Sequence, residues 1–126
     1  MPQNVFSETP RLLAILAAET GSYSHIDKLA NAPNREMALR YLQESLRDYN
    51  SLISRGEFDN PKVGDEVKFL HTKHLEDEIE AIKKISNPRE LKEVLAFISA
   101  KALARTVWLK KEASQTRSES EKEGGE

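Results

Sequence analysis

The sequence lacks several features that would assign it to a common class. It contains no cysteine, which excludes disulfide bonds and thiolate metal sites. No apolar run approaches the roughly 20 residues that a membrane-spanning helix requires, and the first residues carry no basic segment with a long apolar core. We therefore expect no membrane segment and no signal peptide. The 126 residues fit one domain, and a reducing cytoplasm is the expected setting.

Motifs for catalysis and metal binding are also missing. The five glycines are too scattered to form a phosphate-binding loop, and no strand–turn–helix elbow is present to hold a nucleophile. His71 and His74 lie three residues apart with Glu78 one turn later, but neither the di-iron pattern nor the zinc-protease pattern surrounds them. We interpret them as the edge of an amphipathic helix, and we predict no catalytic residue, no metal ligand and no cofactor.

One run of acidic residues could be a Mg²⁺ site or a solvated helix face, because carboxylates on a helix bind Mg²⁺ in some nucleotide pyrophosphohydrolases. Residues 76–78 and Glu80 form this run, and only Glu44, Asp65 and Glu66 could join it from elsewhere. Mg²⁺ requires carboxylates that converge closely, usually from more than one helix, and the spacing here has no recognisable pattern. A solvated acidic face is favoured, and a Mg²⁺-dependent nucleotide hydrolase is kept as an alternative.

The sequence is rich in apolar residues spaced three and four apart, which is the period of an amphipathic helix. Asn87, Pro88 and Glu90 give the clearest start signal, with a cap, a proline at the first position and an acid at the third. The expected long helices cover residues 9–20, 35–55, 65–86 and 88–112, with a loop at 57–64. Between the first two, Ser22 or Ser24 caps a short turn of helix that ends at Ala30. No segment alternates apolar and polar residues as a strand does. We predict an all-α antiparallel bundle of four to five helices, in which the N-terminal helix is the fourth member beside three helices of similar length.

The last residues have a different composition. No apolar residue follows Ala113, and the segment 113–126 holds four acidic residues against two basic ones. Such a segment has nothing to bury in a core. We therefore divide the chain into a helical bundle domain, residues 1–112, and a disordered acidic tail, residues 113–126.

Charge is unevenly distributed although the net charge is only −2. Residues 83–111 contain eight basic side chains against two acidic ones, and residues 99–111 contain no acid. On a helix, Lys101, Arg105 and Trp108 fall within about 60° of one another, beside the apolar stripe. Cations beside an aromatic ring suit a nucleic-acid backbone with unstacked bases. The predicted nucleic-acid-binding residues are Lys101, Arg105, Trp108, Lys110 and Lys111.

The same basic helix is also compatible with roles that involve no nucleic acid. Trp108 and Phe97 could belong to the edge of the core, and cations near a helix C-terminus interact favourably with the helix dipole. The basic helix could instead bind an acidic protein, which would make the chain a protein–protein adaptor. A body with equal numbers of acids and bases is not typical of a strong, free-standing nucleic-acid binder.

Residues 24–33, Ser-His-Ile-Asp-Lys-Leu-Ala-Asn-Ala-Pro, precede a long capped helix. With the Ala-rich basic segment Ser99–Arg105, this order resembles the small subunit of archaeal type I-A CRISPR effector complexes, the Csa5 family, over about residues 12–111. The resemblance implies a non-catalytic helical subunit that lines the complex and contacts other subunits and neighbouring copies. It also implies that the subunit helps to hold the guide RNA–target DNA duplex or the displaced strand. Several copies in a row would compensate for weak binding by each one.

Overall fold

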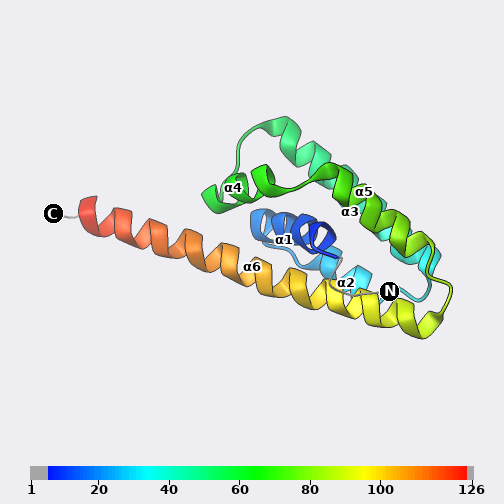
Figure 1. Ribbon diagram of the computed structural model, residues 1–126. Helices are drawn as coiled ribbons and strands as arrows, with labels where there is room; N and C mark the ends of the chain where they lie inside the picture. Colours follow the sequence, from blue (N-terminus) through cyan, green and yellow to red (C-terminus); the bar gives the residue numbers. More distant parts are fainter. Residues whose placement is uncertain (1–5, 125–126) are drawn as a thin grey trace.

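The computed structural model describes the backbone of residues 6–124 and the side chains of residues 6–112. Helices account for nearly all of the described backbone, and no strand occurs within residues 6–124. The helices are α1 (Glu8–Thr20), α2 (Ser24–Ala30), α3 (Arg35–Arg55), α4 (Pro61–Phe69), α5 (Thr72–Lys83) and α6 (Pro88–Gly124). The predicted all-α helical bundle is confirmed (Figure 1).

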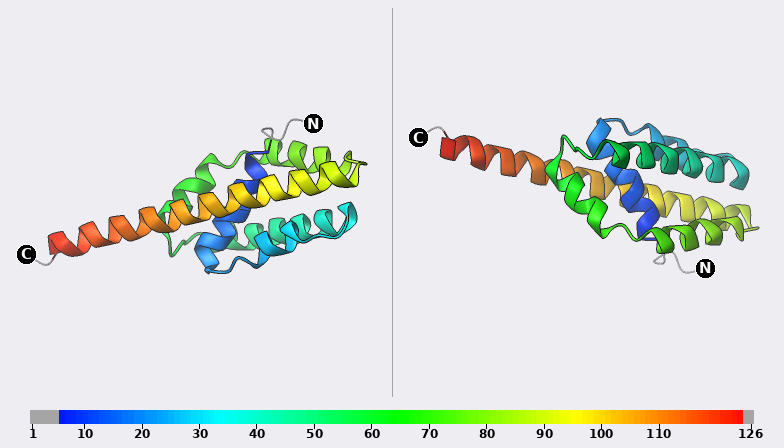
Figure 2. Two further views of the ribbon diagram at one scale, coloured as in Figure 1. Left: turned by 90° about the horizontal axis from the view of Figure 1, so that it is seen from below. Right: turned by 90° about the horizontal axis from the view of Figure 1, so that it is seen from above.

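Helix α1 lies in the middle of the molecule. Figure 1 shows it between α6 on one side and α3 and α5 on the other, and Figure 2 shows it crossing α6 at an angle. Every residue from Leu12 to Ala18 is buried. A helix that is apolar on all sides is stable only when other elements surround it. The N-terminal helix, predicted as the fourth member of the bundle, is therefore its centre.

Opposite faces of α1 pack into two adjoining apolar clusters. Leu13 and Ala17 belong to the first, together with residues of α2, α3, α5 and the N-terminal half of α6. Leu12, Ile15 and Leu16 belong to the second, together with residues of α3, α4 and α5 and with Leu109 of α6. Because both clusters share α1, the position of this helix fixes the spacing between α6 and the opposite helices.

Two adjacent predictions about the middle of the chain are wrong. The expected loop at 57–64 contains the start of α4, where the Asn60 side chain accepts the N–H of Lys62 at 2.9 Å and Pro61 occupies the first helical position. The single helix expected over 65–86 is broken at Leu70, and α5 begins after His71. Asn60 and Pro61 carry the same cap-and-proline signal as residues 87–88. The loop was predicted because Gly64 was taken as a turn residue, whereas it lies within α4.

Helix α6 begins where the sequence predicts but extends further. The Asn87 side chain accepts the N–H of Arg89 at 2.8 Å and that of Glu90 at 3.3 Å. The helix runs to Gly124 instead of ending near Glu112, and its C-terminal part projects beyond the other helices (Figures 1 and 2). At 1.5 Å per residue it is about 55 Å long. Disorder of residues 113–126 in the free protein stays a prediction, and residues 125–126 lie outside the described part.

Candidate nucleic-acid interface

The predicted cation Arg105 is bound to a buried carboxylate. Its Nε donates to Oε2 of Glu66, and its Nη2 donates to Oε1 of the same residue at 3.0 Å. The Glu66 side chain is 1% exposed and that of Arg105 is 39% exposed. A two-point contact of this kind joins a planar guanidinium to a carboxylate in fixed geometry. Arg105 therefore holds α6 to α4, which the sequence did not indicate.

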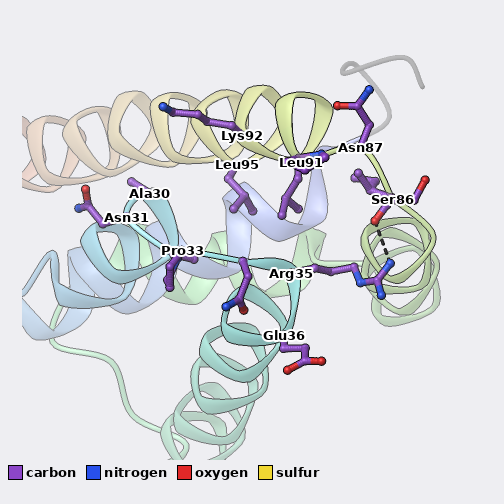
Figure 3. A pocket seen from close by; sticks show the side chains of 14 residues that line it. Ala30, Asn31, Pro33, Arg35, Glu36, Ser86, Asn87, Leu91, Lys92 and Leu95 are labelled. Carbon is purple, nitrogen blue, oxygen red and sulfur yellow. Dashed lines mark hydrogen bonds between the residues drawn. The ribbon is translucent and has the colours of Figure 1, made fainter.

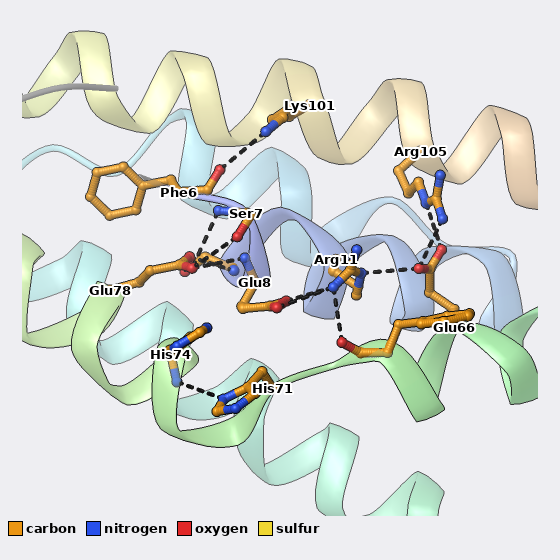
Figure 4. A network of polar contacts seen from close by, with 12 residues as sticks. Phe6, Ser7, Glu8, Arg11, Glu66, His71, His74, Glu78, Lys101 and Arg105 are labelled. Atoms are coloured by element: carbon orange, nitrogen blue, oxygen red, sulfur yellow. Dashed lines mark hydrogen bonds and ion pairs between the residues drawn. The ribbon is translucent and has the colours of Figure 1, made fainter. Parts of the chain in front are cut away.

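The ion pair belongs to a larger network that also includes α1 (Figure 4). Nε of Arg11 lies 3.0 Å from Oε1 of Glu66, and its Nη1 donates to Oε2 of Glu8 at 2.8 Å and to the carbonyl oxygen of Phe69 at 3.0 Å. Arg11 and Arg105 thus share one buried carboxylate from opposite sides. The network supplies the compensating charges that a buried Glu66 requires.

Lys101, Arg105 and Trp108 lie together, as predicted. With Arg11 they line a cavity of about 380 Å³ between α1 and α6. The Arg105 guanidinium stacks on the Trp108 ring at 4.3 Å from its centroid, and the Trp108 side chain is 43% exposed. Nζ of Lys101 lies 5.4 Å from the centre of the Phe97 ring and donates to the Phe6 carbonyl oxygen at 3.4 Å. Arg11 was not among the predicted residues, because it belongs to a helix remote in sequence from α6.

The other two predicted residues lie elsewhere on α6. Lys110 is five residues after Arg105, which places it about 140° away around the helix. Its Nζ lies 5.2 Å from the centre of the Tyr23 ring, which precedes α2. Lys111 is exposed. The structure therefore does not gather all five predicted residues on one face.

Glu78 corrects the prediction of a fully solvated acidic face on α5. It is 5% exposed, and its carboxylate accepts the backbone N–H groups of Glu8 and Thr9, each at 2.8 Å, and of Ser7 at 3.2 Å. The Ser7 side chain makes no cap bond. The first N–H groups of a helix need acceptors, and the dipole favours a negative charge there. Glu78 therefore caps α1 from a different helix.

The two neighbouring histidines lie at the start of α5. The Nδ1 atom of His71 accepts the backbone N–H of His74 at 3.3 Å, and the two rings stack with their centres 3.9 Å apart. Both side chains are exposed. Within the described residues, no group of three or more His, Cys, Asp and Glu side chains is arranged to hold a metal ion.

A larger cavity, of about 880 Å³, lies at the opposite end of the molecule from the projecting part of α6 (Figure 3). It opens where α2 ends and where α3 and α6 begin, and Leu91 and Leu95 form part of its wall. Arg35 at its edge donates to the carbonyl oxygen of Ile85 at 2.9 Å. Its charged lining residues, Arg35, Glu36 and Lys92, include both signs, so the cavity has no strong preference for an anion or a cation.

Comparisons with known proteins identify the family. The family described as "CRISPR-associated protein (Cas_Csa5)" matches residues 12–115. A protein of Archaeoglobus fulgidus, described only as an uncharacterized protein, is 39% identical over 99 residues, which cover 79% of this chain and 85% of that protein. No solved structure matches the chain. No helix of the described residues is long and apolar enough to cross a membrane. With the match spanning four of the six helices completely and most of α1 and α6, the chain belongs to the Csa5 family of CRISPR-associated proteins.

Proposed function

We propose that this chain is the non-catalytic small subunit of a type I-A CRISPR effector complex in the cytoplasm. Its partners are the other subunits of that ribonucleoprotein, neighbouring copies of itself, and the backbones of guide RNA and target DNA. It helps to hold the guide–target duplex or the displaced strand. Family membership supports the role in the complex, and the basic segment 101–111 of α6 supports the contact with nucleic acid.

The observation that carries the nucleic-acid role is the α1–α6 groove with its exposed tryptophan. Arg11, Lys101 and Arg105 line this groove, against the two carboxylates of Glu8 and Glu66. These five side chains have a net charge of +1, beside the partly exposed Trp108 ring. A base can stack on an aromatic face while a lysine neutralises the adjacent phosphate. A surface of this kind holds a strand without reading its sequence.

Within the groove, the roles of the cations differ. Lys101 is exposed, and its ammonium group has two N–H donors besides the one directed at the Phe6 carbonyl oxygen, so it can also reach a phosphate. Lys111 lies exposed further along α6. The guanidinium of Arg105 is already engaged by Glu66 and Trp108. Arg105 therefore positions the Trp108 ring, and the lysines make the phosphate contacts.

The buried carboxylates support the non-catalytic part of the proposal. Glu66 is occupied by two arginines, and Glu78 is occupied by the N-terminus of α1. A Mg²⁺ ion needs carboxylate oxygens that are free to converge on it. Both residues instead hold helices together.

The test compares complexes that contain wild-type subunit with complexes that contain the Lys101→Gln/Lys111→Gln variant. The affinity for target DNA should fall for all sequences about equally, because phosphate contacts carry no base information. For a single strand, the slope of log K against log salt should become shallower by about 1.4, since each lost contact contributes about 0.7.

The matched control is Lys73→Gln/Lys84→Gln, which removes two exposed lysines near the two ends of α5. It should leave both the affinity and the salt slope unchanged. Equal slopes for wild type and the Lys101/Lys111 variant would contradict the proposed contact. If that variant instead fails to join the complex, the basic helix serves a protein partner, as the adaptor alternative holds.

A further inference from the structure

The cavity of about 880 Å³ shown in Figure 3 shares no lining residue with the α1–α6 groove. Two loops enclose it, one between α2 and α3 and one between α5 and α6. Leu91 and Leu95 point toward it from α6, and Ile85 and Pro33 contribute further apolar surface from the two loops. Its volume lies within the range of roughly 300–1,000 Å³ that is typical of ligand pockets. The cavity therefore has room for several side chains of a partner, and its inner wall is apolar.

Three exposed asparagines that line this cavity each use one half of the side-chain amide. Asn34 and Asn87 cap α3 and α6 through their Oδ1 atoms, which accept backbone N–H groups at 2.9 Å and 2.8 Å. Asn31 uses its Nδ2 atom instead, which donates to the carbonyl oxygen of Asp27 at 2.8 Å. An amide side chain has both an NH2 donor and a carbonyl acceptor. Asn34 and Asn87 therefore keep a donor for a partner, and Asn31 keeps an acceptor.

The charges nearly cancel inside the cavity, whereas its mouth is positive. The segments that form the mouth, residues 35–36 and 84–92, contain four basic side chains against two acidic ones. Three of the basic side chains, Lys84, Arg89 and Lys92, are exposed. A partner with a negative charge beside its apolar part would be attracted to this mouth.

We propose that this cavity binds an extended segment of a partner protein, in which one or two large apolar side chains lie next to an acidic residue. The apolar side chains fill the inner part of the cavity. Backbone carbonyl groups of the segment accept hydrogen bonds from Asn34 and Asn87, and one of its backbone N–H groups donates to Asn31. The acidic side chain lies at the mouth, near Arg89 and Lys92.

The chemistry of the cavity favours this occupant over a helix or a nucleic acid. A helix bonds its own N–H and C=O groups internally, whereas an extended chain offers them to the asparagines. A nucleic acid binds through aromatic rings and several available cations. The lining contains no aromatic side chain, and one of its two cations, Arg35, donates to the carbonyl oxygen of Ile85. The inference adds a binding surface to the proposed contact with other subunits, and it rests on that proposal only for the identity of the partner.

The first experiment determines the class of ligand with the isolated full chain and without nucleic acid. A phage-displayed library of random octapeptides is selected on the immobilised protein. The enriched peptides should carry one or two large apolar residues next to an aspartate or a glutamate. The proposal is wrong if no peptide is enriched, or if the enriched peptides are basic.

Substitutions then locate the binding site, with a fluorescently labelled enriched peptide as the probe. Asn34→Ser/Asn87→Ser keeps both helix caps, because serine caps a helix about as well as asparagine, but it removes the two NH2 donors. The dissociation constant should rise roughly tenfold while the melting temperature stays close to that of wild type. The control Asn50→Ser/Asn60→Ser makes the same change at an exposed position of α3 and at the cap of α4, and it should bind the peptide as wild type does. Equal dissociation constants for the two variants would contradict the assigned contacts.

A bulky substitution and a loss of charge provide two further checks. Ala30→Trp adds a large ring to the lining of the cavity from the end of α2 and should weaken binding roughly a hundredfold, whereas Ser51→Trp on the exposed side of α3 should have no effect. Arg89→Gln/Lys92→Gln should weaken the acidic peptide roughly fivefold and leave its Asn or Gln analogue unaffected. Wild-type affinity in the Ala30 variant would show that the peptide binds elsewhere and would overturn the inference.

Competition with DNA separates this inference from the nucleic-acid role. Excess single-stranded DNA should leave the peptide bound, and the Lys101→Gln/Lys111→Gln variant should bind the peptide with wild-type affinity. Displacement of the peptide by DNA would mean that the cavity is a nucleic-acid site, against the inference. The DNA affinity of the Lys101/Lys111 variant is measured in a separate experiment, so either proposal can fail while the other holds.

Discussion

Glu66 and Glu78 differ from the exposed acidic residues beside them, because they are buried and join helices to one another. Each is buried, and each accepts hydrogen bonds from a helix remote in sequence. Glu66 joins α4 to α1 and α6, and Glu78 joins α5 to the start of α1. A buried carboxylate that loses its donors, or donors that lose their carboxylate, destabilises a protein far more than an exposed charge does.

Replacing Glu78 should therefore destabilise the protein strongly. We expect Glu78→Ala to lower the free energy of unfolding by about 2–4 kcal/mol, because it leaves several N–H groups at the start of α1 without an acceptor. Thermal unfolding measures the effect as a loss of roughly 10 °C. Glu76→Ala is the control, since Glu76 is an exposed glutamate of the same helix. Equal melting temperatures for the two variants would contradict the capping role.

Arg105 should also matter for stability, but less. We expect Arg105→Gln to cost about 1–2 kcal/mol, since Glu66 keeps Arg11 and solvent partly screens the lost pair. Lys111→Gln, which removes an exposed cation of the same helix, should change the free energy of unfolding by less than about 0.5 kcal/mol. Urea unfolding of both variants tests the difference. An Arg105 variant as stable as wild type would mean that the guanidinium is free to bind a phosphate.

Among the elements, the long helices could be predicted from the sequence because their signals are local. Asn34 and Asn87 cap α3 and α6 where expected, and Gly21 and Gly56 end α1 and α3 with positive φ angles of 77° and 73°. Helix α4 was missed although Asn60 and Pro61 carry the same kind of signal. Short helices depend on packing that local patterns do not contain.

The candidate site was predictable only in part. Lys101, Arg105 and Trp108 could be grouped from helical spacing, and the structure places them in one groove. The role of Arg105 depends on Glu66, which lies 39 residues earlier on a helix that was not predicted correctly. Arg11 also lines the groove, and it could not be predicted because α1 is remote in sequence from α6. Contacts between remote helices follow from the packing around α1, which a pattern within one helix does not reveal.

The projecting end of α6 gives a prediction for the tail. Deleting residues 113–126 should leave the melting temperature of the diluted monomer within a few degrees of wild type, because no apolar residue follows Ala113. Thermal unfolding at low protein concentration measures the effect. A large loss of stability in the diluted monomer would show that the segment packs against its own bundle.

For the whole molecule, the absence of catalysis is a prediction that can be tested directly. We expect the purified chain to release no product from nucleoside triphosphates with Mg²⁺ or Mn²⁺. His71→Ala, His74→Ala and Glu76→Gln should each leave the activity of the assembled complex unchanged, because these exposed side chains hold no substrate in the proposed role. Metal-dependent turnover that one of these substitutions abolishes would establish the hydrolase alternative.

The enclosed position of α1 also has a consequence for how the chain reaches its native state. Helix α1 is synthesised before α6, yet it packs more extensively against α6 than against any other helix. Contacts between segments far apart in the chain slow the folding reaction. During translation, the apolar segment Leu12–Ala18 stays without its main neighbour until α6 has left the ribosome. Nascent chains of this protein should therefore depend on chaperones until α6 has been synthesised.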